Sequence, residues 1–150
     1  MQESVVFRPR NDAVGAVPAA ATREPVVARY RRVREATLDL VAGLVAEDTV
    51  IQSMPDASPT KWHLAHTTWF FEQFVLGREP RCKPLHPDWQ FLFNSYYQSI
   101  GPMHARADRG RLSRPTLAEV MDYRARVDER SVDVDCVPRD DRSLGQRERE

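Results

Sequence analysis

The chain has 150 residues and equal numbers of basic and acidic side chains, 22 of each, so its formal net charge is zero. A chain of this length builds one modest hydrophobic core but not two large domains. The neutral balance gives no electrostatic reason to expect a nucleic acid or an anionic membrane surface as a partner. Twenty of the basic residues are arginine, which fits either anion recognition by guanidinium groups or the codon bias of a GC-rich genome.

The cysteines and the N-terminus predict the cellular compartment. Cys82 and Cys136 are far apart and neither belongs to a C-x-x-C pair, so neither a zinc ribbon nor a disulfide framework is expected. The N-terminus lacks the basic start and apolar run of a signal peptide, and no stretch approaches the roughly 20 apolar residues of a membrane span. We therefore expect a cytoplasmic protein that does not bind membranes.

The N-terminal part predicts a leader followed by a helix. Residues 1–21 mix prolines, glycine and small residues without a period, which is typical of a disordered leader. From Pro25 to Ala46, aliphatic residues recur at helical spacing and arginines occupy the opposite face. The sequence therefore predicts an amphipathic helix there. Its expected core-facing positions are Val26, Val33, Leu40 and Leu44.

A second helix is predicted from about Pro59 to Leu76, where Gly77 ends it. Ser58 followed by Pro59 is a favourable helix start, because proline suits the first helical position. The aromatic residues of this helix fall on more than one face, so we expect it to be central and mostly enclosed.

The second half of the chain is predicted to hold a structured loop and a third helix. Arg78 to Pro115 is rich in proline and aromatic residues, and we expect one short helical piece near Trp89 to Ser99. "TLAE" at Thr116 to Glu119 matches a capping box, which starts the third helix at about Leu117. Residues 131–150 carry ten charges in 20 positions without a helical period, which predicts a charged disordered tail.

These elements predict an all-α protein with one folded domain at residues 22–130, made of three main helices and a structured loop. Three helices leave the aromatic residues of the second helix without obvious cover. Exposed apolar surface of this kind often marks an interface, so a protein partner that covers the aromatic helix is one expectation.

Two histidines on the second helix are candidate metal ligands. His63 and His66 are three residues apart and lie near one side of the helix, and neutral imidazole is a common ligand of iron, zinc or copper. His66 also shares a face with Trp62, Trp69 and Gln73, which could shield a metal from water. The spacing alone favours the other interpretation, in which the two rings are packed in a helix seam.

The remaining sequence assigns no catalytic residue. His86 and His104 are interpreted as surface histidines in loops. Cys82 lies between two basic residues, but no base is implied for it. Neither a glycine-rich phosphate loop nor a Ser-His-Asp arrangement can be inferred.

Three ordered segments carry a family resemblance: "QSMPDASPTKWHLAHTTWFFEQFVL", "FLFNSYYQSIG" and "RGRLSRPTLAEVMDYRARVD". Together they resemble the N-terminal DinB-like domain of the ergothioneine-biosynthesis sulfoxide synthases of the EgtB type, over about residues 25–130. The resemblance implies a DinB-like four-helix bundle, incomplete here, that the family joins to a larger C-terminal domain. It also implies an iron(II) enzyme that uses O2 to join the sulfur of γ-glutamylcysteine or cysteine to hercynine as a sulfoxide.

The resemblance implies roles for individual residues. Three histidines hold the iron in the family, one in a W-x-L-A-H stretch and two in a later H-x-x-x-H helix. His66 matches the first, whereas His63 lies where the family needs no ligand, and its role stays open. A site with three histidine ligands leaves coordination positions of the iron open for the substrate and O2. Candidates for holding the carboxylate of the thiol substrate are Arg106, Arg109 and Arg111.

The chain departs from the family after Arg130, because no histidine follows. Two of the three ligands and the C-terminal domain are therefore missing, and we expect the chain alone to retain little iron and to be inactive. One interpretation is a truncated or frameshifted oxygenase. The alternative is a freestanding helical module that docks on a partner through its aromatic helix. A DinB-like thiol transferase would need the same missing histidines.

Overall fold

The computed structural model describes residues 24–133, and this part of the chain is helical without any strand. The all-α prediction of three main helices and a structured loop is confirmed. The expected leader and most of the expected tail lie outside the described residues. No helix among the described residues is long and apolar enough to cross a membrane. The α-helices are α1 (Val26–Asp39), α2 (Thr60–Phe74), the short α3 (Trp89–Phe93) and α4 (Leu117–Val132), and the 3-10 helices are η1 (Asp48–Val50), η2 (Leu76–Arg78) and η3 (Arg106–Arg111).

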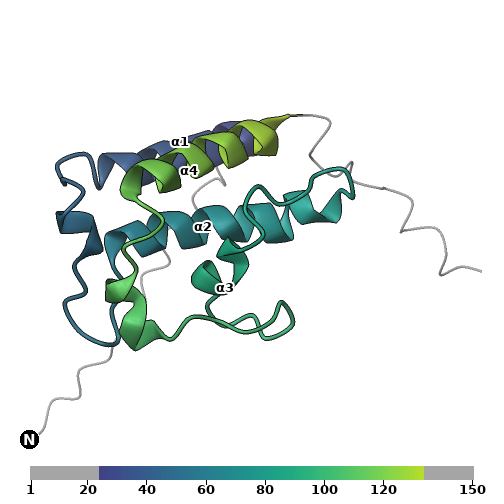
Figure 1. Ribbon diagram of the computed structural model, residues 1–150. Helices are drawn as coiled ribbons and strands as arrows, with labels where there is room; N and C mark the ends of the chain where they lie inside the picture. The colour runs from purple at the N-terminus through teal and green to yellow at the C-terminus, as the bar shows by residue number, and fades with distance from the viewer. Residues whose placement is uncertain (1–23, 134–150) are drawn as a thin grey trace, which may run out of the picture.

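The three long helices run side by side, with α1 and α4 on one side of α2 and α3 on the other (Figure 1). α2 and α4 are parallel, since Lys61 near the start of α2 reaches the carbonyl of Leu112 just before α4, while Glu72 near its end bonds Tyr123. The segment between α2 and α4 folds back along α2. This arrangement places the loop on the face of α2 that α1 and α4 leave open.

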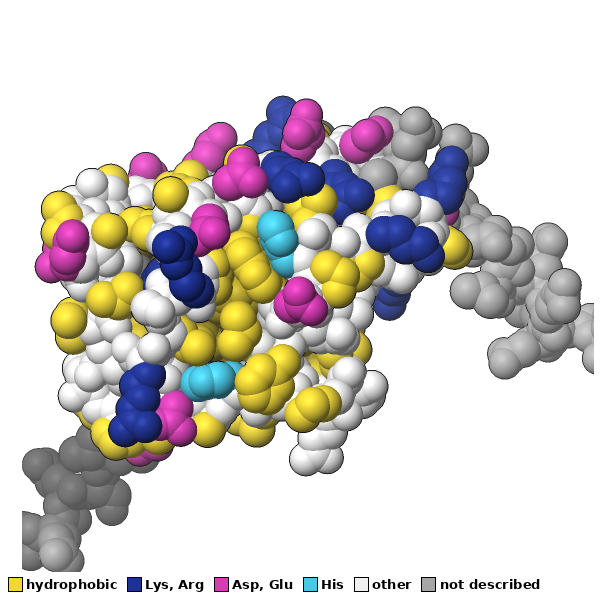
Figure 2. Space-filling model, in the orientation of Figure 1, with side chains coloured by type: hydrophobic (Ala, Val, Ile, Leu, Met, Phe, Trp, Pro, Cys, Tyr) yellow, Lys and Arg dark blue, Asp and Glu magenta, His cyan; other side chains and the backbone are white. Residues whose placement is uncertain are grey.

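α2 is the centre of the core, as predicted. The expectation that its aromatic residues lack cover is wrong for the tryptophans, because Trp62 is 3% and Trp69 2% exposed. The loop predicted from its prolines acts as a covering layer, since it carries buried Cys82 and Phe93. On the face seen in Figure 2, hydrophobic side chains gather at the centre and charged ones along the edge formed by α1 and α4.

The predicted orientation of α1 is wrong. Val26, Val33, Leu40 and Leu44 were expected to face the core, but they are 82%, 49%, 84% and 40% exposed. The buried residue of α1 is Arg34. The helix also ends at Asp39 rather than at Ala46.

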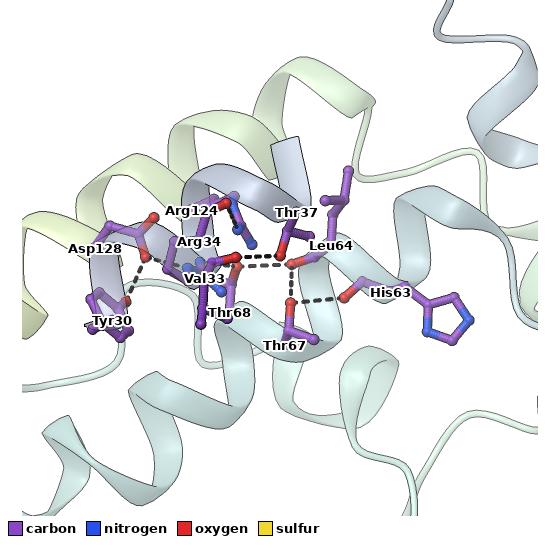
Figure 3. Close-up of polar contacts among 10 residues, drawn as sticks. All are labelled: Tyr30, Val33, Arg34, Thr37, His63, Leu64, Thr67, Thr68, Arg124 and Asp128. Atoms are coloured by element: carbon purple, nitrogen blue, oxygen red, sulfur yellow. Dashed lines mark hydrogen bonds and ion pairs between the residues drawn. The ribbon is translucent and has the colours of Figure 1, made fainter. Parts of the chain in front are cut away.

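A polar interface explains this orientation of α1 (Figure 3). The guanidinium of Arg34 donates from Nε to the carboxylate of Asp128 at 2.7 Å and from Nη2 to the hydroxyl of Thr68 at 2.9 Å. Tyr30 donates to the same Asp128 oxygen at 2.6 Å, and Arg124 donates to the Arg34 carbonyl at 2.9 Å. A buried guanidinium must satisfy its donors, so these bonds outweigh the pull of the aliphatic stripe.

The two predicted helix starts have different outcomes. The capping box of α4 is confirmed, because the Thr116 hydroxyl accepts from the Glu119 amide at 3.2 Å and the Glu119 carboxylate accepts from the Thr116 amide at 2.7 Å. Ser58 does not cap α2, which begins at Thr60. Its hydroxyl instead accepts a hydrogen bond from Arg109.

Candidate functional site

His66 lies on α2 with one ring nitrogen held by the backbone. Its Nδ1 is 2.7 Å from the carbonyl oxygen of Phe93 on α3. A carbonyl only accepts, so Nδ1 carries the proton and Nε2 keeps its lone pair. Histidines that bind metals typically use their second nitrogen in this way, because the bond fixes the ring and its tautomer.

The ring of His66 is enclosed by two tryptophans. It stacks on Trp62 with centroids 4.6 Å apart and on Trp69 at 5.8 Å, so the three residues share one face of α2 as predicted. Burial lowers the pKa of His66 and nearby Arg109 lowers it further, although the bond to Phe93 opposes them. The site therefore favours a neutral imidazole, which is the form that binds metals.

His63 has different surroundings. It is exposed, meets Trp62 edge-on with centroids 5.6 Å apart, and in Figure 3 its ring points away from the polar contacts of α1. Burial of part of the ring, followed by the charge of Arg109, lowers the pKa of His63. The structure gives the ring of His63 two interactions, packing against Trp62 and a hydrogen bond with the Ser58 backbone, and the hydrogen bond opposes the lowering of its pKa.

Arg109 on η3 is the second notable side chain of the site. Its Cζ lies 3.5 Å from the centroid of the Trp62 ring, and the residue is only 4% exposed. Two groups cannot share one face of an indole at these distances, so Arg109 and His66 lie on opposite faces of Trp62. The order of the stack is Arg109, Trp62, His66, Trp69.

Arg109 is an incompletely satisfied cation. Nη1 donates to the hydroxyl of Ser58 at 2.8 Å, whereas Nε is buried without a hydrogen-bond partner. No carboxylate among the described residues forms an ion pair with it. Burial, with a contribution from Arg106, lowers the pKa of Arg109 to about 10, so it is still charged at neutral pH. A buried cation without a counter-charge is suited to an anionic ligand.

The other two predicted arginines are placed differently. The Cζ of Arg106 lies 5.0 Å from the ring centroid of exposed Tyr96. The side chain of Arg111 is 85% exposed and pairs with Asp108 at 2.9 Å. Of the three, only Arg109 is packed into the stack beside His66.

Gln52 positions the turn that carries Arg109. Its amide nitrogen donates to the carbonyl of Arg106 at 2.8 Å, and its amide oxygen accepts from the Gly110 amide at 2.6 Å. A Cβ on Gly110 would lie 2.7 Å from the Cβ of Gln52, so this close approach requires glycine. Sequence reasoning missed Gln52 because neither its type nor its spacing signals a role.

His86, predicted to be a surface histidine, is partly buried. Its ring stacks on Trp89 with centroids 4.0 Å apart and meets Tyr123 edge-on at 5.6 Å. His104 is partly buried, and its ring lies 5.8 Å from that of Phe91.

The described residues supply part of a metal site only. Among residues 24–133, no three histidine, cysteine, aspartate or glutamate side chains gather into a group that could hold a metal ion. A complete three-histidine iron site therefore does not fit within this part of the chain, although His66 has the tautomer and enclosure of a ligand.

The sequence model of the DinB superfamily matches residues 29–134, from α1 to the end of α4. The chain belongs to the DinB superfamily. Some members of the DinB superfamily are metal-dependent. No match was found among curated proteins. Membership agrees with the helical architecture and leaves the individual activity open.

Proposed function

We propose that this chain is the DinB-type part of an iron(II)- and O2-dependent sulfoxide synthase that joins the sulfur of γ-glutamylcysteine or cysteine to hercynine. His66 is one iron ligand in this proposal. The observation that carries it is the hydrogen bond from Nδ1 to the Phe93 carbonyl, which leaves the lone pair of Nε2 for a metal. The three sequence segments that resemble the EgtB-type enzymes support this choice within the superfamily.

Arg109 is the residue that we propose for the carboxylate of the thiol substrate. It is buried, charged and without an acidic partner among the described residues, and its Nε has no acceptor. A carboxylate could receive two parallel N–H bonds from a guanidinium, which fixes its orientation as well as its position. Exposed Arg111 is a weaker candidate, since Asp108 already engages it.

The first test is ligand binding by the full chain, measured by calorimetry or NMR with γ-glutamylcysteine and with cysteine. We expect binding that Arg109→Gln abolishes and that the matched variant Arg111→Gln leaves within about twofold. Absence of binding to either thiol, or binding that does not depend on Arg109, would contradict the substrate assignment.

The second test is iron content after anaerobic loading with iron(II) and gel filtration. One imidazole does not hold iron(II) against water, so we expect far less than one iron per chain and no O2-dependent conversion of hercynine. Stoichiometric iron that disappears in His66→Ala would show that the chain holds the metal by itself.

The third test is to read the source DNA beyond the codon for Arg130 in all three frames. The proposal expects a frame that encodes an H-x-x-x-H helix followed by a long domain. Absence of such a frame would favour the alternative, a helical module that docks on a protein partner. We place that alternative second because Trp62 and Trp69, two of the aromatic residues of the helix expected to dock, are buried within the chain.

A further inference from the structure

Most of the exposed large hydrophobic residues of the described part come from one stretch of the sequence. Eight of its eleven large exposed hydrophobic residues lie between residues 26 and 54. Val26 and Val33 of α1 and Leu40, the residue that directly follows α1 with helical backbone angles, are seven residues apart and therefore form one line along the helix. The apolar stripe, as we call these three residues, lies on a different face from buried Arg34. An exposed line of this kind is typical of a helix that pairs with another helix.

The charges beside the apolar stripe run opposite to the helix macrodipole. Arg29 lies in the N-terminal half of α1, where neighbouring Arg32 is paired with Glu24 at 3.0 Å, while Asp39 is the last residue of the helix. The first turn holds no acidic side chain and the last turn no basic one. Positive charge near the N-terminus and negative charge near the C-terminus destabilise a helix slightly. The stability of α1 itself therefore does not explain the positions of Arg29 and Asp39.

We propose that α1 packs antiparallel against α1 of a second copy of this chain. A two-fold axis near residues 33 and 34 brings Val33 against Val33 of the second copy, and Val26 against Leu40 of the second copy. The same arrangement places Arg29 beside Asp39 of the second copy at both ends. The two macrodipoles then oppose each other, and the charge pattern that is unfavourable within one helix becomes complementary between two.

The size of the surface predicts a weak dimer. α1 has 14 residues and is therefore about 21 Å long. A single helix face of this length buries less than the roughly 800 Å² per partner of a standard interface. We expect a dissociation constant of about 10 to 100 μM, which rises with salt because the flanking charges are exposed.

Analytical ultracentrifugation of the full chain over a wide concentration range tests this proposal. Leu40→Asp should weaken dimerisation at least tenfold without changing thermal unfolding, since Leu40 is 84% exposed. The matched control is Arg31→Glu, which also adds negative charge but lies on the opposite side of α1 from Val33. It should leave dimerisation within about twofold.

A charge exchange makes the test specific for the antiparallel pairing. Arg29→Glu and Asp39→Arg should each weaken the dimer several-fold, and the double variant should recover it. The proposal is overturned by a monomer at every concentration, by a dimer that tolerates Leu40→Asp, or by a double variant no tighter than the single ones. In those cases another protein or residues outside 24–133 cover the apolar stripe.

Discussion

The two interfaces that hold the long helices together are built from different chemistry. α4 attaches to α2 mainly through buried apolar side chains, including Val120, Val127 and Trp69, with one buried hydrogen bond from Tyr123 to Glu72. α1 attaches through the guanidinium of Arg34, with its carboxylate and hydroxyl partners. The first interface is stabilised by removal of apolar surface from water, which is insensitive to direction, while the second depends on the geometry of a few bonds. α1 should therefore be the helix that separates first.

The largest effect is expected in the apolar core. Leu64 on α2 is 2% exposed, so Leu64→Ala should lower the free energy of unfolding by about 2–5 kcal/mol. Urea unfolding followed by circular dichroism measures it. Leu40→Ala, at the exposed residue that directly follows α1, is the matched control and should change stability by no more than about 0.5 kcal/mol. Equal losses of stability in Leu64→Ala and Leu40→Ala would contradict the distinction between the apolar core and the exposed face of α1.

A smaller loss in the free energy of unfolding is expected when the polar interface between α1 and the other helices is removed. Arg34→Met removes the bonds to Asp128 and Thr68 and should cost about 2 kcal/mol, less than for a fully buried pair because the Asp128 side chain is 28% exposed. Limited proteolysis should show cleavage in α1 before α2 and α4.

Arg124→Met is the informative control for that variant. Arg124 is equally buried, but its Nε and Nη1 have no hydrogen-bond partners, and burial lowers its pKa to about 10. Its removal should therefore cost less than that of Arg34 or even stabilise the protein. A larger loss for Arg124→Met would show that α1 depends on that residue instead.

A third variant examines the start of α4. Thr116→Ala removes the hydroxyl that accepts from the Glu119 amide, and the expected cost is about 1 kcal/mol. Thr116→Ser keeps the hydroxyl and should retain most of the stability. If both variants behaved alike in urea unfolding, the cap would not contribute.

The smallest effect concerns pH. Burial lowers the pKa of His66 in the folded protein, so the folded state binds fewer protons than the unfolded state below about pH 6.5, the ordinary histidine value. The stability that depends on the neutral ring is complete above that pH and is lost as pH falls through it toward the folded pKa. His63 shifts in the same direction. Unfolding measured at about pH 7.5 and pH 5.5 should show a smaller loss in His66→Asn than in the unchanged chain; an equal loss would exclude His66 as the cause.

Local patterns predicted α2, the short helix near Trp89 and the capped start of α4, because each has a signal within a few neighbouring residues. The orientation of α1 could not be predicted in this way. Its aliphatic periodicity points to one face, whereas Arg34 is drawn to the core by Asp128, whose position depends on the packing of α4. Hydrophobic periodicity identifies an apolar face but not what covers it.

The candidate site shows the same limit. The spacing of Trp62, His66 and Trp69 correctly predicted a shared face. The carbonyl of Phe93 and the guanidinium of Arg109 reach that face only through the fold of the loop, so no local signal announces them.

The ring stacks of the chain have a consequence for spectroscopy. The chain contains three tryptophans, and each stacks on a histidine: Trp62 and Trp69 on His66, and Trp89 on His86. Because an imidazole in contact with an indole quenches its emission more strongly when it is protonated, the intrinsic fluorescence of this protein reports on its histidines without any label. A ligand that engages Nε2 of His66 should therefore change the fluorescence of the two tryptophans around it.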